Sequence, residues 1–405
     1  MRSTVDNDGL LSGIRVLDLA DEKASFCSKL LAGMGARVIK IESPGGDASR
    51  KIGPFWMNSP HPEKSLSFLY NNTNKLSITV NLEHSDGREI FLRLINRTDV
   101  VVETFPPGYL QELRLGFDVL SGINSRLILV SVTGFGQDGP RRDHKSCDLV
   151  ASAFGGQMYV SGSPSTSPLK AFGEQSHYTA SLFATVGILL SLRKRDQSGR
   201  GEHIDISLQE AVIATLEHVM IRYFHEQIIP RRQGSLHWNR AFRVFPCQDG
   251  FIHMTLFHQW ETLVEWMDSE CMAQDLTDKK WDDEEYRMRH LDHVIEVLGR
   301  WTRTHTRNEL FELGQLMGFP WAPVSSPMEI ADSPQLKARN FFLDIEHPEV
   351  GLSLRYPGLP FKSSRRFSTK QKRAPLVGED NVHVYQEELG LSEEEMSRLS
   401  CINVI

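Results

Sequence analysis

The sequence predicts an α/β protein with a parallel sheet, and two observations lead to this prediction. Residues 13–20 (GIRVLDLA) and 36–42 (ARVIKIE) are apolar and rich in β-branched side chains, and the segment between them, 25–33, has a helical composition. A strand–helix–strand unit of about thirty residues needs a right-handed crossover, which makes its two strands parallel. The alternation continues through a helix at 87–97 and strands at 76–82, 99–105 and 126–136. The N-terminal third is therefore expected to form an α/β layer.

The first domain is expected to extend to residue 225. Apolar residues over 178–195 are spaced for a buried helix, and the glycines of 199–201 (GRG) predict its end. Residues 203–224 then predict a short strand followed by a long helix. We assign 1–225 to the N-terminal part of a large domain.

A change of composition after residue 225 predicts a second domain. Residues 242–256 contain two β-rich runs around a Gln-Asp-Gly turn, and 259–318 are charged, rich in tryptophan and helical in pattern. We assign 226–325 to this smaller domain. Residues 326–405 contain many Pro, Gly and basic residues before a predicted closing helix at 392–400, and they form a linker and a C-terminal part.

The composition excludes several classes of protein. The 405 residues include 45 Lys and Arg against 52 Asp and Glu, a formal charge of −7, so binding to a nucleic-acid backbone is not expected. No uncharged apolar stretch approaches the roughly 18 residues that a membrane helix needs. Five cysteines lie far apart without a CxxC pair, which argues against a disulfide or zinc framework. We expect a soluble cytoplasmic protein with no membrane contact.

Three motifs that often mark a site are weak in this sequence. Residues 134–139 spell GxGxxG after an apolar strand, but Pro140 follows where a dinucleotide-binding motif needs a helix. His144 and Cys147 could begin a metal site, but two ligands do not close one, and no metal is expected. No GxSxG segment supports a serine hydrolase.

Ten segments in fixed order resemble the family III CoA-transferases, the CaiB/BaiF group, over residues 13–400. The segments are 13–20, 35–55 (GARVIKIESPGGDASRKIGPF), 72–82, 99–110, 126–140, 147–156, 199–211, 316–324 (LMGFPWAPV), 333–342 and 375–381 (PLVGEDN). Ordered agreement of many segments is far more specific than any single motif.

The resemblance implies a fold and a chemistry. The fold would be a Rossmann-like large domain built from both chain ends, a small α+β domain, and a dimer of interlocked subunits. The substrates would be a CoA thioester and a carboxylic acid, with no covalently bound cofactor. In the family an Asp carboxylate attacks the acyl-CoA, giving a mixed anhydride and then an enzyme–CoA thioester, which is nucleophilic catalysis by a carboxylate.

This sequence departs from the family at the attacking carboxylate. The family's Asp lies ten residues before the glycine that opens a GIL-type helix segment; that glycine is Gly187 here, and the matching residue is His177. Glu174, three residues earlier, is the nearest carboxylate. In the racemase branch of the family, an acid–base pair would occupy the positions of Cys147 and His177, so racemisation is disfavoured.

The expected CoA contacts are altered as well. Glu112 and Glu83 stand where relatives often place a cation for the CoA phosphates, and a carboxylate repels a phosphate. The CoA-binding candidates that remain are Lys23, Lys40, Lys75, Phe105 and Arg114.

These departures favour a non-catalytic subunit. Its partner would be a paralogue that carries the Asp, in a heterodimer or heterotetramer, and the complex would move CoA between acids, such as from succinyl-CoA to an aromatic succinate like benzylsuccinate in anaerobic aromatic degradation. Two alternatives stay open. One is a homodimeric CoA-transferase or CoA-thioester hydrolase that uses Glu174 or His177, and the other is an assembly protein without a ligand.

Overall fold

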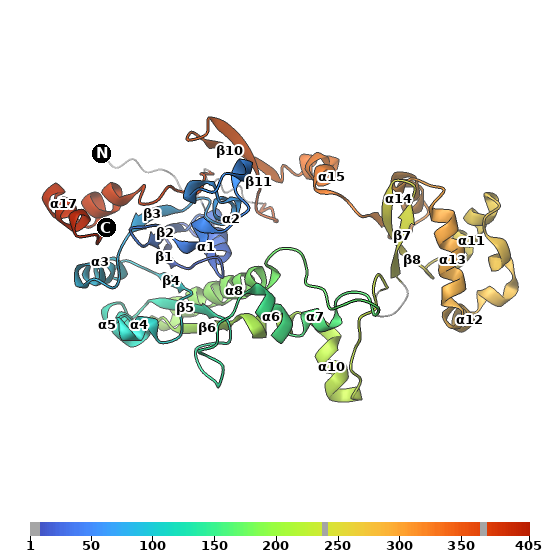
Figure 1. Ribbon diagram of the computed structural model, residues 1–405, viewed down its shortest axis with the longest axis horizontal. Helices are drawn as coiled ribbons and strands as arrows, with labels where there is room; N and C mark the ends of the chain where they lie inside the picture. The colour runs from blue at the N-terminus through green and yellow to red at the C-terminus, as the bar shows by residue number, and fades with distance from the viewer. Residues whose placement is uncertain (1–8, 237–241, 365–370) are drawn as a thin grey trace. The chain divides into compact units, whose positions relative to one another are not determined.

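The computed structural model describes residues 9–236, 242–364 and 371–405 (Figure 1). The chain divides into two compact units. The first contains Met1–Met158, Lys170–Ile229 and Asn340–Ile405, and the second contains Tyr159–Leu169 and Pro230–Arg339. Both ends of the chain therefore build the first unit.

The first unit is organised around a six-stranded parallel sheet, which confirms the predicted α/β class. Its strands follow the order β3-β2-β1-β4-β5-β6. Because the order runs outward in opposite directions from β1 and β4, the sheet has a switch point between them, where α/β proteins bind ligands at the carboxyl ends of the strands. The strands are β1 (Arg15–Leu19), β2 (Arg37–Glu42), β3 (Leu76–Thr79), β4 (Val100–Glu103), β5 (Ile128–Thr133) and β6 (His203–Ser207).

Helices cover both faces of this sheet, so its inner strands are buried on both sides, as parallel strands usually are. On one face, Leu31 of α1 (Ser25–Gly33) and Ile188 of α8 (Gln175–Ser198) pack against β-strand residues such as Val102. On the other face, Phe91 of α3 (Ser85–Ile95) and Leu120 of α5 (Phe117–Ile123) pack beside Leu17. The other α-helices of this unit are α2 (Leu66–Asn71), α4 (Tyr109–Glu112), α6 (Asp148–Phe154), α9 (Leu208–Ala214), α10 (Glu217–Glu226) and α17 (Glu393–Cys401). The short α7 (Gln157–Val160) begins in this unit and ends in the second.

The C-terminal segment covers the free edge of the sheet at β3. Asp380 Oδ2 accepts a hydrogen bond from Ser77 N, and Asn381 Oδ1 accepts one from Thr79 N, both at 2.9 Å. The buried Tyr385 hydroxyl donates to Thr79 O at 2.5 Å. These contacts satisfy backbone groups that an edge strand otherwise leaves unpaired. A hairpin of β10 (Phe342–His347) and β11 (Leu352–Pro357) precedes this segment.

The second unit has its own core around an antiparallel sheet of β7 (Phe242–Cys247), β8 (Gly250–Thr255) and β9 (Ala322–Pro323). The pair β7–β8 is the hairpin that the sequence predicts. Trp266, Trp301 and Trp321 are almost fully buried in this core. Its helices are α11 (Trp260–Ser269), α12 (Glu284–Arg289), α13 (Leu291–Thr302), α14 (Arg307–Leu316), α15 (Pro327–Asp332) and α16 (Pro334–Ala338).

The unit boundaries differ from the sequence prediction of 226–325 in three ways. The main segment of the second unit begins at Pro230. The second unit continues to Arg339, because α15 and α16 belong to it. It also contains 159–169, which the sequence analysis places in the large domain. Hydrogen bonds explain this, since Gly234 N donates to Gly162 O at 2.9 Å and Arg232 Nε donates to Ser163 O at 3.2 Å.

The described part of the chain contains neither a helix suited to span a membrane nor a cluster of metal ligands. None of the helices in the described ranges combines the length and the apolar character that a membrane span requires. Nor do the described His, Cys, Asp and Glu side chains form any group of three or more that could hold a metal ion.

Candidate CoA site and the position of the missing carboxylate

A cavity of about 1010 Å³ lies in the first unit at the carboxyl ends of the parallel strands. Every strand from β1 to β5 contributes to its wall. The wall includes Lys23 after β1, 43–48 after β2, 80–83 after β3, 104–107 after β4, and Thr133 at the end of β5. The cavity therefore spans the β1–β4 switch point, where the strand order predicts a ligand site.

Of the five predicted CoA contacts, two line the cavity and three do not. Lys23 and Phe105 line the cavity, and Lys23 is paired with Asp21. Lys40 and Lys75 do not line it, because both side chains are fully buried in ion pairs. Arg114 is exposed and lies outside the lining.

The two acidic residues that differ from the family pattern, Glu83 and Glu112, lie in different places. Glu83 lines the cavity, and the Tyr109 hydroxyl lies 3.4 Å from its Oε1 atom. Glu112 is exposed on α4 and is not part of the lining. Of these two departures, only Glu83 therefore faces the cavity.

Sequence reasoning missed the segment 142–146, which also lines the cavity. It supplies Arg142, which pairs with Asp143 at 3.1 Å, and the exposed Lys145. This segment could have been predicted from its position after a predicted parallel strand, because loops that follow the carboxyl ends of such strands meet near the switch point.

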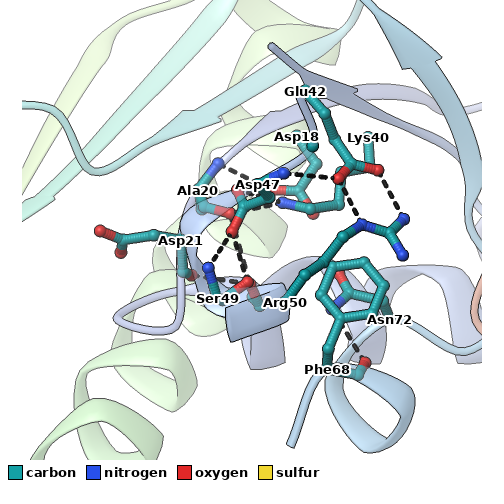
Figure 2. Close-up of polar contacts among 12 residues, drawn as sticks. Asp18, Ala20, Asp21, Lys40, Glu42, Asp47, Ser49, Arg50, Phe68 and Asn72 are labelled. Carbon is teal, nitrogen blue, oxygen red and sulfur yellow. Dashed lines mark hydrogen bonds and ion pairs between the residues drawn. The ribbon is translucent and has the colours of Figure 1, made fainter. Parts of the chain in front are cut away.

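Lys40 and Lys75 belong to a buried ion network. Figure 2 shows Lys40 among its neighbours Ala20 and Asp47. Lys75 Nζ donates to Asp18 Oδ2 at 2.8 Å, and Lys40 Nζ donates to Asp47 Oδ2 at 3.1 Å and to Ala20 O at 2.8 Å. Burial alone would raise the pKa of Asp18, but Lys75 and Lys40 hold it below its ordinary value. Both lysines therefore serve the fold instead of facing a ligand.

Arg50 extends this network to the loop after β2. Its Nε and Nη2 atoms donate to both oxygens of Glu42 at 2.6 and 2.8 Å (Figure 2). Its Nη1 atom donates to Glu63 at 2.7 Å. Glu42 also accepts from Asp47 N at 2.8 Å. Because 43–48 line the cavity, these bonds fix one of its walls.

A second buried acid, Glu103, fixes the wall after β4. It is 4% exposed, and its Oε2 atom accepts from Phe105 N at 2.7 Å. Burial raises the pKa of Glu103 to about 7, against the lowering effect of hydrogen bonds from Ser131 and Phe105. Ser131 Oγ in turn lies 2.9 Å from His203 Nε2.

His177 and Glu174 meet in the first turn of α8. His177 Nδ1 lies 3.2 Å from Glu174 Oε2, and His177 is only 4% exposed. Its Nε2 atom is buried and has no hydrogen-bond partner among the described residues. A hydrogen bond from His177 is the largest cause of the lowered pKa of Glu174.

This turn is anchored next to the loop after β1. Asp148 Oδ1 accepts from Ser176 N at 2.8 Å and from Ser176 Oγ at 2.7 Å, which fixes the start of the helix. Ser181 Oγ lies 3.5 Å from the carbonyl oxygen of Lys23, whose side chain lines the cavity. Neither His177 nor Glu174 is itself a lining residue. His177 does act on the loop after β1, because its charge lowers the pKa of Glu22 there, although burial and Asp21 raise that pKa above its ordinary value.

Comparison with known proteins identifies the family. Residues 11–381 match the family model described as CoA-transferase family III. The chain belongs to this family.

Its relatives resemble it over nearly their whole length. A Thauera aromatica protein named succinyl-CoA:(R)-benzylsuccinate CoA-transferase subunit BbsE is 33% identical over 91% of this chain and 92% of its own. A Chloroflexus aurantiacus protein named succinyl-CoA–L-malate CoA-transferase beta subunit is 32% identical over 98% of each chain. The crystal structure of a CAIB/BAIF family protein from Brucella suis superposes with a TM-score of 0.85, at 26% identity, over 94% of this chain and 99% of that one.

Family III CoA-transferases move CoA between carboxylic acids, and they use CoA thioesters as substrates without a bound cofactor. Such chemistry needs an acyl-accepting carboxylate at the thioester. The family match thus makes the imidazole of His177 the main chemical question at this site.

Arg50→Met should destabilise the first unit by about 3–5 kcal/mol, because it leaves Glu42 and Glu63 without their cation in a buried setting. Urea unfolding at pH 7 measures this change. Arg126→Met is the matched control, since Arg126 pairs with Asp196 at an exposed site and should cost less than about 1 kcal/mol. Equal stability of the two variants would contradict a structural role for the network.

Glu103→Gln should stabilise the protein at pH 8, on the order of 3 kcal/mol, and by almost nothing at pH 4. The folded state keeps the Glu103 proton up to about pH 7, whereas an unfolded chain releases it near pH 4.5. Wild-type stability from this group therefore falls as the pH rises between these values, while glutamine stays neutral and can still accept from Phe105 N. Urea unfolding from pH 4 to 8 tests this, with exposed Glu394→Gln as control; a variant that loses stability at pH 8 would refute it.

Proposed function

We propose that this chain is the non-catalytic subunit of a heteromeric family III CoA-transferase. The observation that carries the proposal is His177, a buried imidazole at the position where the family's attacking Asp is expected. The partner would be a paralogous subunit that carries this Asp. The two would form a heterodimer or heterotetramer, with subunits interlocked as the family resemblance implies.

The chemistry of the reaction supports this assignment. In the double displacement, a side-chain carboxylate oxygen attacks the thioester carbon and CoA leaves as a thiolate. The thiolate then attacks the side chain's own carboxyl carbon in the resulting anhydride, the donor acid leaves as a carboxylate, and CoA becomes bound to the side chain as a thioester. An imidazole has no carboxyl carbon, so His177 cannot carry CoA in this way.

Two charged residues of the cavity lining, Glu83 and Lys23, support the proposed non-catalytic role as well. Glu83 faces the cavity and would repel a CoA phosphate, while the cavity-lining Lys23 is already paired with Asp21. We narrow the proposed CoA contacts of this chain to Lys23 and Phe105. Lys40, Lys75 and Arg114 are dropped from the proposal because they lie outside the cavity lining.

The names of two relatives point to the assembly and to the substrates. Both the Thauera and the Chloroflexus proteins are named as subunits, and both names include succinyl-CoA. We propose that the complex takes CoA from succinyl-CoA and gives it to an aromatic succinate such as benzylsuccinate.

The proposal predicts activity only in a mixed complex. Purified alone, this chain should show no CoA transfer from succinyl-CoA to benzylsuccinate, whereas co-expression with an Asp-bearing paralogue should restore it. His177→Ala in this chain should keep the complex within about twofold of full rate, because no bond to the acyl group forms here, while Asp→Asn in the partner should abolish turnover. Full activity of the lone chain would refute the proposal.

One observation favours a second candidate function. Glu174 provides a carboxylate next to His177, and its side chain is 44% exposed. A homodimeric CoA-transferase or a CoA-thioester hydrolase could use Glu174 as nucleophile, or His177 as a base that Glu174 orients.

This candidate predicts that Glu174→Gln or His177→Ala abolishes turnover by the lone chain, and that hydroxylamine traps an acyl-enzyme when Glu174 is the nucleophile. Gln175→Ala, an exposed neighbour, is the control. Unchanged turnover in both variants would exclude this candidate.

A further inference from the structure

Lys29 on α1 is a partly buried cation without an anionic partner. Its Nζ atom lies 3.2 Å from the centroid of the Tyr70 ring and 5.8 Å from that of Phe26. Within the described part of the chain, no carboxylate pairs with it, and the only charged group that shifts its pKa is another cation, Lys75. Burial is the larger cause, and the pKa of Lys29 falls to about 7.

Two aromatic rings, Phe26 and Tyr70, face this amine, and a third, Tyr178, packs against Phe26. Phe26 packs edge-on against Tyr178 at a centroid distance of 4.9 Å and stacks with Tyr70 at 6.3 Å. All three rings are partly exposed, as is Lys29. They form a cluster of one cation and three rings, contributed by α1, α2 and α8.

The cluster adjoins the position of the missing carboxylate. Tyr178 follows His177 in the first turn of α8, and its pKa is raised by burial and then by the charge of Glu174. The Ser181–Lys23 contact at 3.5 Å joins the beginnings of α8 and α1. An acid bound over the rings would therefore lie next to His177, at the position where the family's attacking Asp is expected.

Lys29 is unfavourable for the stability of the isolated chain. Removing a cation from water without pairing it costs free energy, which the ring contacts offset only in part. A methionine would fill the same space without that cost. Residues that violate local stability rules in this way mark functional sites more often than others.

The geometry points to a subsite for an aryl-substituted carboxylic acid, in which a carboxylate of the acid pairs with Lys29 and its ring packs against Phe26, Tyr70 and Tyr178. This inference rests on the proposed function and adds to it a residue set for the acid that accepts or releases CoA. An ammonium group recognises the carboxylate, and ring–ring contacts favour an aryl acid over an aliphatic one of equal charge.

Calorimetric titration of the purified chain, and of its complex with the Asp-bearing paralogue, tests this subsite with benzylsuccinate and succinate as free acids. We expect benzylsuccinate to bind more tightly than succinate. Lys29→Met should weaken both acids by about tenfold or more, and Lys29→Arg should retain most of the binding. Tyr178→Leu should weaken benzylsuccinate and leave succinate nearly unchanged.

Two controls separate binding from folding. Lys194→Met removes an exposed lysine of α8 that pairs with Glu202, and it should change neither affinity. Lys29→Met should be at least as stable as the wild type to urea, so a loss of binding in this variant cannot come from unfolding.

Three results would overturn the subsite: equal affinity for the two acids, wild-type affinity in Lys29→Met, or no binding of benzylsuccinate to either form of the protein. Catalytic activity of the lone chain would refute the non-catalytic role instead, and because titration of the free acids needs no turnover, the two failures are distinguishable.

Discussion

The structure of the first unit depends on a buried set of charges that compensate one another. Asp18, Glu42 and Asp47 lie among Lys40, Arg50 and Lys75 at β1, β2 and the loop after β2, and Arg50 also pairs with the partly exposed Glu63. Each of these charges has an opposite charge beside it, and this matters because a buried charge left without its partner destabilises a fold strongly. The set joins the loops that follow β1 and β2, and through Arg50 Nη2 and Pro375 O, 3.0 Å apart, it reaches the C-terminal segment. The cavity wall and the closure of the sheet thus share one support.

Much of the fold could be predicted because parallel strands that are buried on both faces appear in sequence as continuous apolar runs. The charged residues within those runs were harder to interpret. Lys40 and Lys75 look like phosphate ligands as long as their partners are unknown, and Asp18 and Asp47 come close to them only in the folded chain. The boundary at Arg339 was missed for a similar reason, since the contacts that assign a short helix to a unit are tertiary.

One pair of candidate residues could be proposed from spacing along one helix. Counting back from Gly187 leads to His177, and a separation of three residues lets Glu174 reach it, as the 3.2 Å contact between the two side chains shows. Lys29 carried no such signal. Its meaning depends on rings from α2 and α8 that are distant in sequence, and on the absence of a carboxylate partner among the described residues. A sequence pattern predicts which residues share a face of a helix, but it does not predict which charged side chains lack a partner in the folded chain.

The contact between β3 and residues 380–385 has a consequence for the synthesis of the protein. A nascent chain leaves the ribosome from its N-terminus, so the strands of the first unit emerge long before the residues that protect their edge. Residues 230–339, in contrast, emerge as one uninterrupted segment and can complete their own core earlier. During translation the exposed edge of β3 is therefore open to pairing with other chains. The hydrogen bonds from Asp380, Asn381 and Tyr385 to β3 can therefore form only late in synthesis, after the second unit has emerged.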